Sequence, residues 1–487
     1  MSWGLSVMGA EVKQFLLGCC VAAVAGAASA EDFGAAVDAL LARNAPALFG
    51  IAAPLAHSAD PSPMQGYRVP GRTAADSIAL AAGLVAEFLT TEAAEHSDMM
   101  AFYPAAAPSH LISCIESDAE TLEPGKMQPG VQRISLADGK VDTIVRGTSH
   151  CDGIRTTPWG TILFTEERDQ GGAYEILNPL AISEPVTVLN GDTGETTDPT
   201  AVVRRPALPI MRWEGTAILG SGVIYGGDEL RPGTTAPNAD GGAMFKFIPA
   251  LPHAGGAIAR LEDSPLVAGK TFAMQVQCER DLVQYGQGCE VGNATWVEVD
   301  PAKARKQAHS KGATGFYRPE DLHQDLTYTA GVRFCFSNTG NDVAKNYAEI
   351  MCATDSDPMA PGPYAAGKLA PTTVINRFIE GDTEFNSFDN LDFQPGTGIL
   401  YVAEDHENGD IWACLPDGAD RDVKSDGCIR VASVKDSSAE PTGFIFDASG
   451  KAAYLSIQHS DDSAMPKVDG YGTDDLLKIT GFGEVQK

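Results

Sequence analysis

The residues best suited to chemistry in this sequence are acidic side chains that recur at one place in a loose repeat. Five stretches share a form in which an acidic residue is followed, eight to ten positions later, by a glycine in an apolar run. The acid–glycine pairs are Asp152 and Gly160, Glu214 and Gly222, Asp321 and Gly331, Asp389 and Gly398, and Glu440 and Gly450. Such acids commonly cap turns, but carboxylate oxygens are also the ligands that Ca²⁺ and Mg²⁺ prefer. Carboxylates gathered at one place would repel each other unless cations lay between them.

The segments around these acids predict an all-β fold. After about Leu111 the chain consists of short β-branched and aromatic runs separated by Gly, Asp and Pro, and residues 130–145 have the pattern of a hairpin that turns at Asp138-Gly139. A degenerate repeat near fifty residues, with two strands joined by a glycine turn, is typical of propeller blades. We therefore expect a six-bladed β-propeller. The innermost strands of its blades would bring the repeated acids together around the axis.

The chain before Leu111 has a different pattern. We interpret residues 1–30 as a signal peptide, because Lys13 precedes an apolar stretch that ends at Ala28-Ser29-Ala30. A lipoprotein signal ending at Cys19 is the alternative. Residues 31–110 are expected to form a partly helical N-terminal region, since apolar residues recur at helical spacing over 35–41 and 78–88. Residues 111–487 would form the propeller, and the expected location is the periplasm or the exterior.

Cysteine usage is informative in an exported protein. Eight cysteines follow the proposed leader, and six of them form close sequential couples: Cys278 and Cys289, Cys335 and Cys352, and Cys414 and Cys428. In an oxidising compartment these couples are candidate disulfides. Cys114 and Cys151 are left over. Either they pair with each other, or one of them is a thiolate available for chemistry.

Composition narrows the classes of partner. The chain has 35 Lys and Arg against 65 Asp and Glu, which gives a net charge of −30. Such a charge repels phosphate backbones and anionic lipid, so we expect no nucleic-acid binding and no membrane adhesion. The mature chain has no long apolar run that would predict an integral membrane segment. The acidic excess would equally serve to keep a secreted protein in solution.

Five motifs, in order, resemble those of the PhoX-type alkaline phosphatases, which are secreted six-bladed propellers with a mixed iron–calcium cluster on the axis. They are CDGIRTTPWGTILFTEE from Cys151, RWEG with VIYGGDE and MFKFIP, GATGFYRPEDL, SFDNLDFQPGTGILYVAED and AEPTGFIFDASGKAAYLSIQH. The resemblance covers about residues 110–465. The leader, however, lacks the twin arginine usual in that family, and DMMAFYP at 98–104 has no counterpart in its well-characterised members, which suggests a divergent branch.

The resemblance implies roles for individual residues. Cys151 matches an iron-ligating cysteine and Arg318 a phosphate-binding arginine. Glu166, Glu167, Glu214 and Glu320 match metal carboxylates, while Asp389 and Glu440 lie in motifs of the same family and are expected to bind metal. A thiolate suits iron better than calcium, so Cys151 beside carboxylates would indicate both metals; a disulfide to Cys114 would leave calcium alone. We assign neither His150 nor His459 to a metal, because a histidine near a strand end is more often structural.

The expected function is metal-dependent hydrolysis of small phosphate monoesters by a monomeric enzyme, with a metal-activated oxygen nucleophile attacking phosphorus. No G-x-S-x-G elbow, P-loop or Rossmann fingerprint is present to support another chemistry. Two alternatives stay open. One is a non-catalytic propeller that binds a partner and uses metals only for stability. The other is a calcium-dependent, lactonase-like hydrolase.

Overall fold

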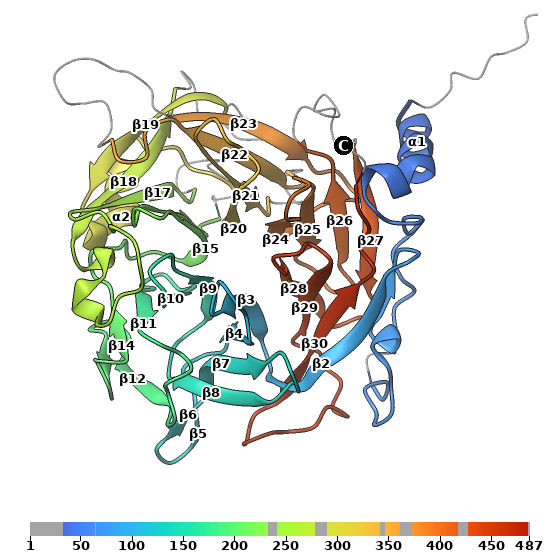
Figure 1. The fold of residues 1–487 in the computed structure, drawn as a ribbon, viewed down its shortest axis with the longest axis horizontal. Coiled ribbons are helices and arrows are strands. Elements are labelled where there is room, and N and C mark those ends of the chain that lie inside the picture. Colours follow the sequence, from blue (N-terminus) through green and yellow to red (C-terminus); the bar gives the residue numbers. More distant parts are fainter. Residues whose placement is uncertain are drawn as a thin grey trace, which may run out of the picture.

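Largely antiparallel β-sheets arranged around a central axis make up most of the structure (Figure 1). The computed structural model describes residues 33–63, 65–231, 241–277, 290–340, 346–360, 373–416 and 427–485. The expected predominantly β, propeller-like architecture is confirmed. Within these residues no helix is long and apolar enough to cross a membrane.

Six strands lie nearest the axis, and each neighbours the next around a closed circle, as Figure 1 shows. In circular order they are β3 (Ser97–Tyr103), β9 (Cys151–Thr156), β15 (Trp213–Ile218), β20 (Pro319–Gln324), β24 (Phe388–Phe393) and β28 (Glu440–Phe446). Each pairs antiparallel with the strand that follows it in the chain. These second strands are β4 (His110–Ile115), β10 (Ile162–Glu166), β16 (Ile224–Asp228), β21 (Val332–Asn338), β25 (Leu400–Glu404) and β29 (Ala452–Gln458).

The outer strands complete five large sheets. The six-stranded sheet adds β7 (Pro129–Ser135), β8 (Val141–Arg146), β12 (Val186–Asn190) and β13 (Glu195–Thr196), and a four-stranded sheet adds β11 (Ala173–Ile176) and β14 (Val202–Arg204). The nine-stranded sheet adds β17 (Met244–Pro249), β18 (Gly269–Val276), β19 (Gly292–Val299), β22 (Glu349–Asp355) and β23 (Thr373–Glu380). The five-stranded sheet adds β26 (Asp410–Cys414), β27 (Cys428–Val434) and β1 (Ile78–Leu80), and the last four-stranded sheet adds β30 (Thr473–Thr480) and β2 (Val85–Ala94).

Six separate sheets were expected, and the structure differs in one place. Strands β19 and β23 pair through residues 292–294 and 373–375, which joins two potential blades into the nine-stranded sheet. Both ends of that sheet, β15 and β20, still lie at the axis. The expected hairpin at Asp138-Gly139 is present between β7 and β8, and Gly139 adopts a positive φ of 71° in its turn.

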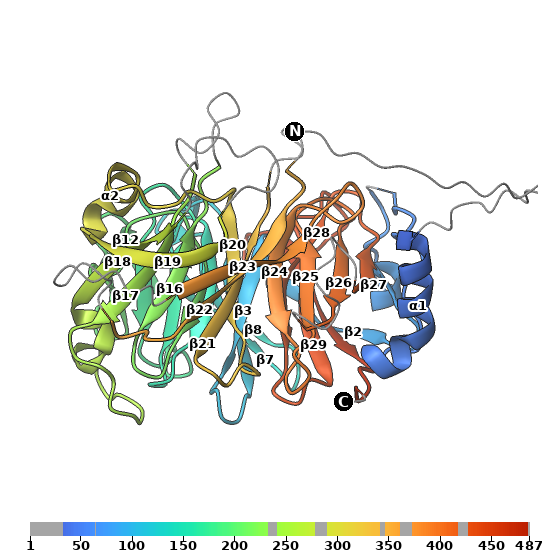
Figure 2. The ribbon, with the colours of Figure 1, turned by 90° about the horizontal axis from the view of Figure 1, so that it is seen from above.

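Few elements lie outside these sheets. A separate two-stranded sheet pairs β5 (Thr121–Glu123) with β6 (Lys126–Met127). The α-helices are α1 (Phe33–Leu48) and α2 (Ala304–Ser310), and short 3₁₀ turns are η1 (Ala74–Asp76), η2 (Leu261–Asp263), η3 (Pro265–Val267) and η4 (Pro301–Lys303). Helix α1 lies at the outer rim beside β27, as Figure 2 shows, where Leu41 and Ala45 join an apolar core shared with β25 to β30.

The N-terminal region is helical only in part. Helix α1 agrees with the expected helix over 35–41, but the apolar run over 78–88 forms β1 and β2 instead. Strand β1 pairs with β27, and β2 pairs with β30, so partners about 350 to 400 positions away decide the conformation. Strands β3 and β4 then form one sheet with β7 and β8, so the expected boundary at residue 110 falls inside a sheet.

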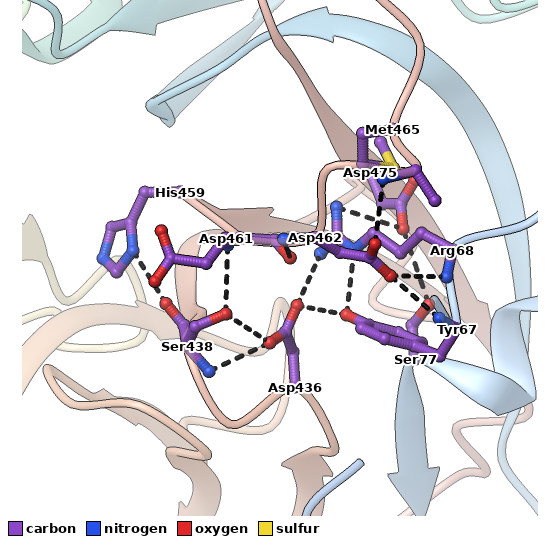
Figure 3. Close-up of polar contacts among 12 residues, drawn as sticks. Tyr67, Arg68, Ser77, Asp436, Ser438, His459, Asp461, Asp462, Met465 and Asp475 are labelled. Atoms are coloured by element: carbon purple, nitrogen blue, oxygen red, sulfur yellow. Dashed lines mark hydrogen bonds and ion pairs between the residues drawn. The ribbon is translucent and has the colours of Figure 1, made fainter. Parts of the chain in front are cut away.

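A buried polar network reinforces this joining of the N-terminal and C-terminal parts (Figure 3). The guanidinium of Arg68 is fully buried, 3.3 Å from the Asp436 carboxylate and 3.6 Å from that of Asp475. Asp462 accepts the backbone N–H groups of residues 66–68 at 2.8–3.0 Å. The segment before β1 is therefore fixed to the loops that follow β27 and β29.

Two expected disulfides are present. Cys335 bonds Cys352 between β21 and β22, and Cys414 bonds Cys428 between β26 and β27; each pair lies directly opposite in its ladder. The third expected couple, Cys278 and Cys289, lies outside the described residues.

Candidate metal centre

Each of the six innermost strands carries an acidic residue at its first or second position. It is the second residue of the strand in five cases and the first in β28. We name these residues the inner acidic ring: Asp98, Asp152, Glu214, Glu320, Asp389 and Glu440. Because the six strands surround the axis in the same register, their carboxylates gather at one end of it. The sequence predicted such a gathering.

A second set of residues comes from the ends of the neighbouring strands. The residue that follows each second strand is Glu116, Glu167, Glu229, Thr339, Asp405 or His459, and we name these the outer set. The hairpin register places each of them beside the start of an inner strand. For example, the backbone N–H of Glu167 donates to the carbonyl of His150 at 2.7 Å, and that of Glu229 donates to Arg212 at 3.0 Å. Four of the outer set add carboxylates to the same end of the axis.

The residues just before the inner strands have unusual backbone conformations. His96, His150, Arg318 and Ser387 each stand two positions before a ring acid and adopt φ values of 50–65°. Left-handed backbone is unfavourable for residues other than glycine and clusters at functional sites in proteins. The same left-handed conformation therefore recurs at four equivalent places, each just before a strand that carries a ring acid.

Two groups of three carboxylates are close enough to share an ion. One contains Asp152, Glu167 and Glu214, and the other contains Glu214, Glu320 and Asp389; within each group the ligand oxygens lie within 4.8 Å of one another. Glu214 belongs to both groups. The structure thus brings together four of the ligands expected from the resemblance, Glu167, Glu214, Glu320 and Asp389, with Asp152, which the repeat alone predicted.

The electrostatics of the ring favour a cation. Burial, followed by neighbouring carboxylates, raises the pKa of Asp98, Asp152 and Glu214 well above the usual range. Burial also raises the pKa of Glu320 to about 8. Oδ1 of Asp98 and Oδ1 of Asp152 are buried and have no hydrogen-bond partner in the described part of the chain. Buried carboxylate oxygens without donors are the arrangement that a hard cation satisfies, so the residues fit Ca²⁺.

Cys151 is not a metal ligand in this structure, contrary to the expectation from the resemblance. Its sulfur is bonded to Cys114, which connects β9 with β4. A disulfide sulfur carries no thiolate, and the thiolate is the form that binds iron. Of the two alternatives for Cys151, a disulfide to Cys114 or an iron-binding thiolate, the structure has the disulfide. Cys151 therefore no longer supports iron.

Glu166 and Glu440 have local partners. Glu166 accepts the backbone N–H of Ser149 at 3.1 Å and pairs with Arg168 at 3.2 Å; among the described residues it belongs to neither metal group. Of the two adjacent glutamates, only Glu167 faces the ring. Glu440 accepts a hydrogen bond from Nε2 of His459 at 2.9 Å, and burial raises the pKa of Glu440 to about 7.

Arg318 lies at the edge of the acidic centre and pairs with three of its carboxylates. Its guanidinium contacts Glu320 at 3.0 Å, Asp405 at 3.1 Å and also Glu229. Arg212 contacts the same Glu229 at 2.6 Å. Two arginines at equivalent places, each two residues before a ring acid, therefore share one carboxylate at the edge of the ring.

Sequence reasoning missed Asp98, Glu116, Glu229 and Asp405. Asp98 was assigned to the helical region, and the other three follow strands whose ends could not be located. One signal for Asp98 was available: His96-Ser97-Asp98 repeats the form of His150-Cys151-Asp152. The sequence repeat predicted Asp321 as the acid of this strand, but the ring position is held by its neighbour Glu320. Asp321 pairs with Arg155 at 2.7 Å.

Comparison with known proteins gives structural matches only. No family model and no curated protein matches the sequence. PhoX of Pseudomonas fluorescens, solved with vanadate, a transition-state analogue, is 15% identical; the match covers 87% of this chain and 99% of that one, with a TM-score of 0.58. The gluconolactonase XC5397 of Xanthomonas campestris (12% identity, 86% and 98% covered, TM-score 0.39) and the PQQ-bound aldose sugar dehydrogenase of Streptomyces coelicolor (13%, 82% and 99%, 0.42) are more distant. The chain thus has a PhoX-like propeller fold.

Proposed function

We propose that this protein is a metal-dependent phosphatase acting on small phosphate monoesters. The observation that carries the proposal is the buried inner acidic ring, in which one oxygen each of Asp98 and Asp152 has no hydrogen-bond partner among the described residues, with two arginines at its edge. The fold shared with PhoX supports it. For this purpose we count the nine-stranded sheet as two blades, which gives six blades with one ring acid each.

The metal ions would be held by the two carboxylate groups. Asp152, Glu167 and Glu214 would hold one ion, and Glu214, Glu320 and Asp389 a second. All donors are oxygens, which favours calcium; iron is no longer supported by Cys151. When bound, such ions neutralise phosphate charge and lower the pKa of a bound water.

The arginines would recognise the phosphate. The side chain of Arg318 is 16% exposed. Of its three carboxylate partners, Glu320 belongs to a proposed metal group, while Glu229 and Asp405 belong to the outer set. Cations that took up Glu320 would leave N–H groups of Arg318 for phosphate oxygens. Arg212, more exposed and fixed by Glu229, would hold the same phosphate from the neighbouring strand.

We also propose that the protein acts outside the cytoplasm as a monomer. Its three described disulfides form in oxidising compartments. Together with the leader proposed for residues 1–30, they support a periplasmic or secreted location.

A second candidate is the calcium-dependent, lactonase-like hydrolase. The observation that favours it is the disulfide at Cys151, because a site with oxygen ligands alone has no ligand that selects iron. In this candidate the same ring would hold calcium for a neutral substrate. Arg212 and Arg318 would then have no anion to bind.

One assay separates the candidates. Purified protein loaded with Ca²⁺ would be given p-nitrophenyl phosphate and, separately, gluconolactone. If the protein is a phosphatase, it should hydrolyse p-nitrophenyl phosphate, and a chelator should abolish this activity. Glu214→Gln and Arg318→Ala should each reduce the rate about 10²–10³-fold. Glu298→Gln, on the exposed side of β19, is the matched control and should leave the rate unchanged. Turnover of the lactone alone would establish the second candidate, and turnover of neither substrate would favour a binding protein.

A further inference from the structure

A third group of possible ligands differs from the other two because it contains a histidine. Glu116, His150 and Glu167 offer ligand atoms that lie within 4.8 Å of one another. Nδ1 of His150 is 3.3 Å from Oε1 of Glu116, and Nε2 of the same ring is 3.1 Å from Oδ1 of Asp118. The imidazole therefore has one carboxylate at each nitrogen, and one nitrogen faces the group.

Several contacts orient the carboxylates of this group. Nε2 of Gln458 donates to Oε2 of Glu116 at 3.2 Å and to Oδ2 of Asp98 at 3.0 Å. The other oxygen of Asp98, a residue only 5% exposed, lacks a hydrogen-bond partner anywhere in the described ranges. Glu116 and Glu167 also offer carboxyl oxygens within 4.8 Å of each other. Two carboxylates in contact, with a buried unpartnered carboxylate oxygen beside them, are the arrangement that a bound cation would satisfy.

A disulfide and backbone hydrogen bonds position the same three residues. The Cys114–Cys151 disulfide is two residues before Glu116 and one residue after His150. The backbone N–H of His150 donates to the carbonyl of Ser117 at 2.9 Å, and His150 in turn accepts from the N–H of Glu167 at 2.7 Å. Each ligand is thus held at its backbone, which reduces the entropy lost when an ion binds.

An ion could reach the group from solvent. Glu116 and His150 line a cavity of about 230 Å³ together with His96 and Asp118. Asp118, which also lines this cavity, is largely exposed. Glu167 is buried and is shared with the oxygen-only group of Asp152 and Glu214.

We propose that Glu116, His150 and Glu167 form a further site, next to the oxygen-only groups and sharing Glu167 with one of them, for a borderline divalent transition metal such as Zn²⁺. Nδ1 of His150 and one oxygen from each glutamate would bind the ion, and Nε2–H would donate to Asp118, which fixes the ring and its tautomer. An imidazole nitrogen suits such a metal far better than it suits Ca²⁺. The rival explanation is a protonated His150 that only forms ion pairs with Glu116 and Asp118.

Zinc binding by the full-length protein tests the proposal. After treatment with chelator, Zn²⁺ would be titrated calorimetrically in saturating Ca²⁺, which keeps the oxygen-only groups filled. The wild type should bind one Zn²⁺. Asp118→Asn, a change at an exposed residue that should not disturb folding, should weaken this binding about 10–100-fold, and His150→Asn should weaken it further. His309→Asn, on the exposed side of α2, is the matched control and should bind like the wild type.

X-ray absorption at the zinc edge provides a second readout. One imidazole should appear among the ligands of the wild type and of His309→Asn, and none in His150→Asn. Unchanged zinc affinity in both His150→Asn and Asp118→Asn, or an oxygen-only spectrum in the wild type, would overturn the proposal in favour of the ion pair. Both measurements report metal binding alone, so a failure of the phosphatase assay would leave this result standing.

Discussion

Glu214 is the residue on which the two oxygen-only groups depend, since it belongs to both. It is buried, and burial together with Asp152 and Glu320 raises its pKa well above the usual range. Its charge is therefore unfavourable without metal and necessary with metal. A substitution of Glu214 should therefore change the stability of the apo-protein and the affinity for cations in opposite directions.

Glu214→Gln should have opposite effects in the two states. Without metal the variant should be at least as stable as the wild type, because a buried carboxyl whose ionised form is unfavourable there has been replaced by a neutral amide of the same shape. Calcium should then stabilise the variant much less than the wild type, because an anionic ligand is missing. Thermal unfolding with chelator and with Ca²⁺ measures both effects. A variant stabilised by calcium as strongly as the wild type would exclude Glu214 as a ligand.

At the scale of elements, the register of six hairpins is what converts separate residues into a site. Ser97 lies opposite Ile115, Cys151 opposite Glu166, and Trp213 opposite Asp228, so each ring acid is accompanied by a residue of the outer set. Changes that release one of these strands should therefore affect metal binding even where they touch no ligand.

Removal of the Cys114–Cys151 bond is such a change. The double variant Cys114→Ala, Cys151→Ala opens a link between residues 37 positions apart and should lower the free energy of unfolding by about 2–4 kcal/mol. Zinc affinity should fall as well, because Glu116 and His150 are no longer held together. Urea unfolding and zinc titration measure the two quantities. Removal of Cys414–Cys428 in the same way is the control, and it should leave zinc affinity unchanged; equal zinc affinity in all three proteins would contradict the prediction.

The N-terminal segment that carries Arg68 is a second element-scale case. Arg68→Ala leaves the buried Asp436 carboxylate without its guanidinium partner, whereas Asp475 keeps its contact with Arg72; the change should cost about 3–5 kcal/mol. Backbone amides of β2 and β30 should then exchange hydrogen faster, because these strands join the two ends of the chain. Lys478→Ala breaks a more exposed pair with Glu87 and should cost less than about 1 kcal/mol. Equal losses of unfolding free energy in the two variants would show that the buried network around Arg68 does not help to hold the two ends of the chain together.

At the scale of the whole molecule, the ring makes stability depend on pH in opposite directions with and without metal. The folded-state pKa is raised to about 7 for Glu440 and about 8 for Glu320, above the usual value near 4.5. Between pH 4.5 and 8 the folded apo-protein therefore binds protons that the unfolded chain has released. Its unfolding free energy should fall as the pH rises through this window.

Saturating calcium should reverse this trend, because the ion binds the deprotonated carboxylates and competes with protons. Urea unfolding at pH 5 and at pH 8, with chelator and with Ca²⁺, measures the four values. The apo-protein should be more stable at pH 5, and the gain in stability from calcium should be larger at pH 8. A calcium effect independent of pH would mean that the ions bind away from the ring.

The sequence alone determined the local parts of this protein. The alternation of short apolar runs with Gly and Asp predicted the β-sheets, the acid–glycine spacing predicted the gathering of carboxylates, and close cysteine couples predicted Cys335–Cys352 and Cys414–Cys428. In each case the signal and the contact lie within one hairpin or recur from hairpin to hairpin.

Only the tertiary structure decided the rest. Residues 78–88 have apolar residues at spacings that fit a helix, but pairing with β27 and β30, at the other end of the chain, makes them strands. The same closure places Asp98 in the ring, and the packing of β4 against β9 joins Cys114 to Cys151 and brings Glu116 to His150. Local patterns carry no information about which distant strand will be the neighbour. The composition of the site depends on that choice, because its ligands come from different sheets.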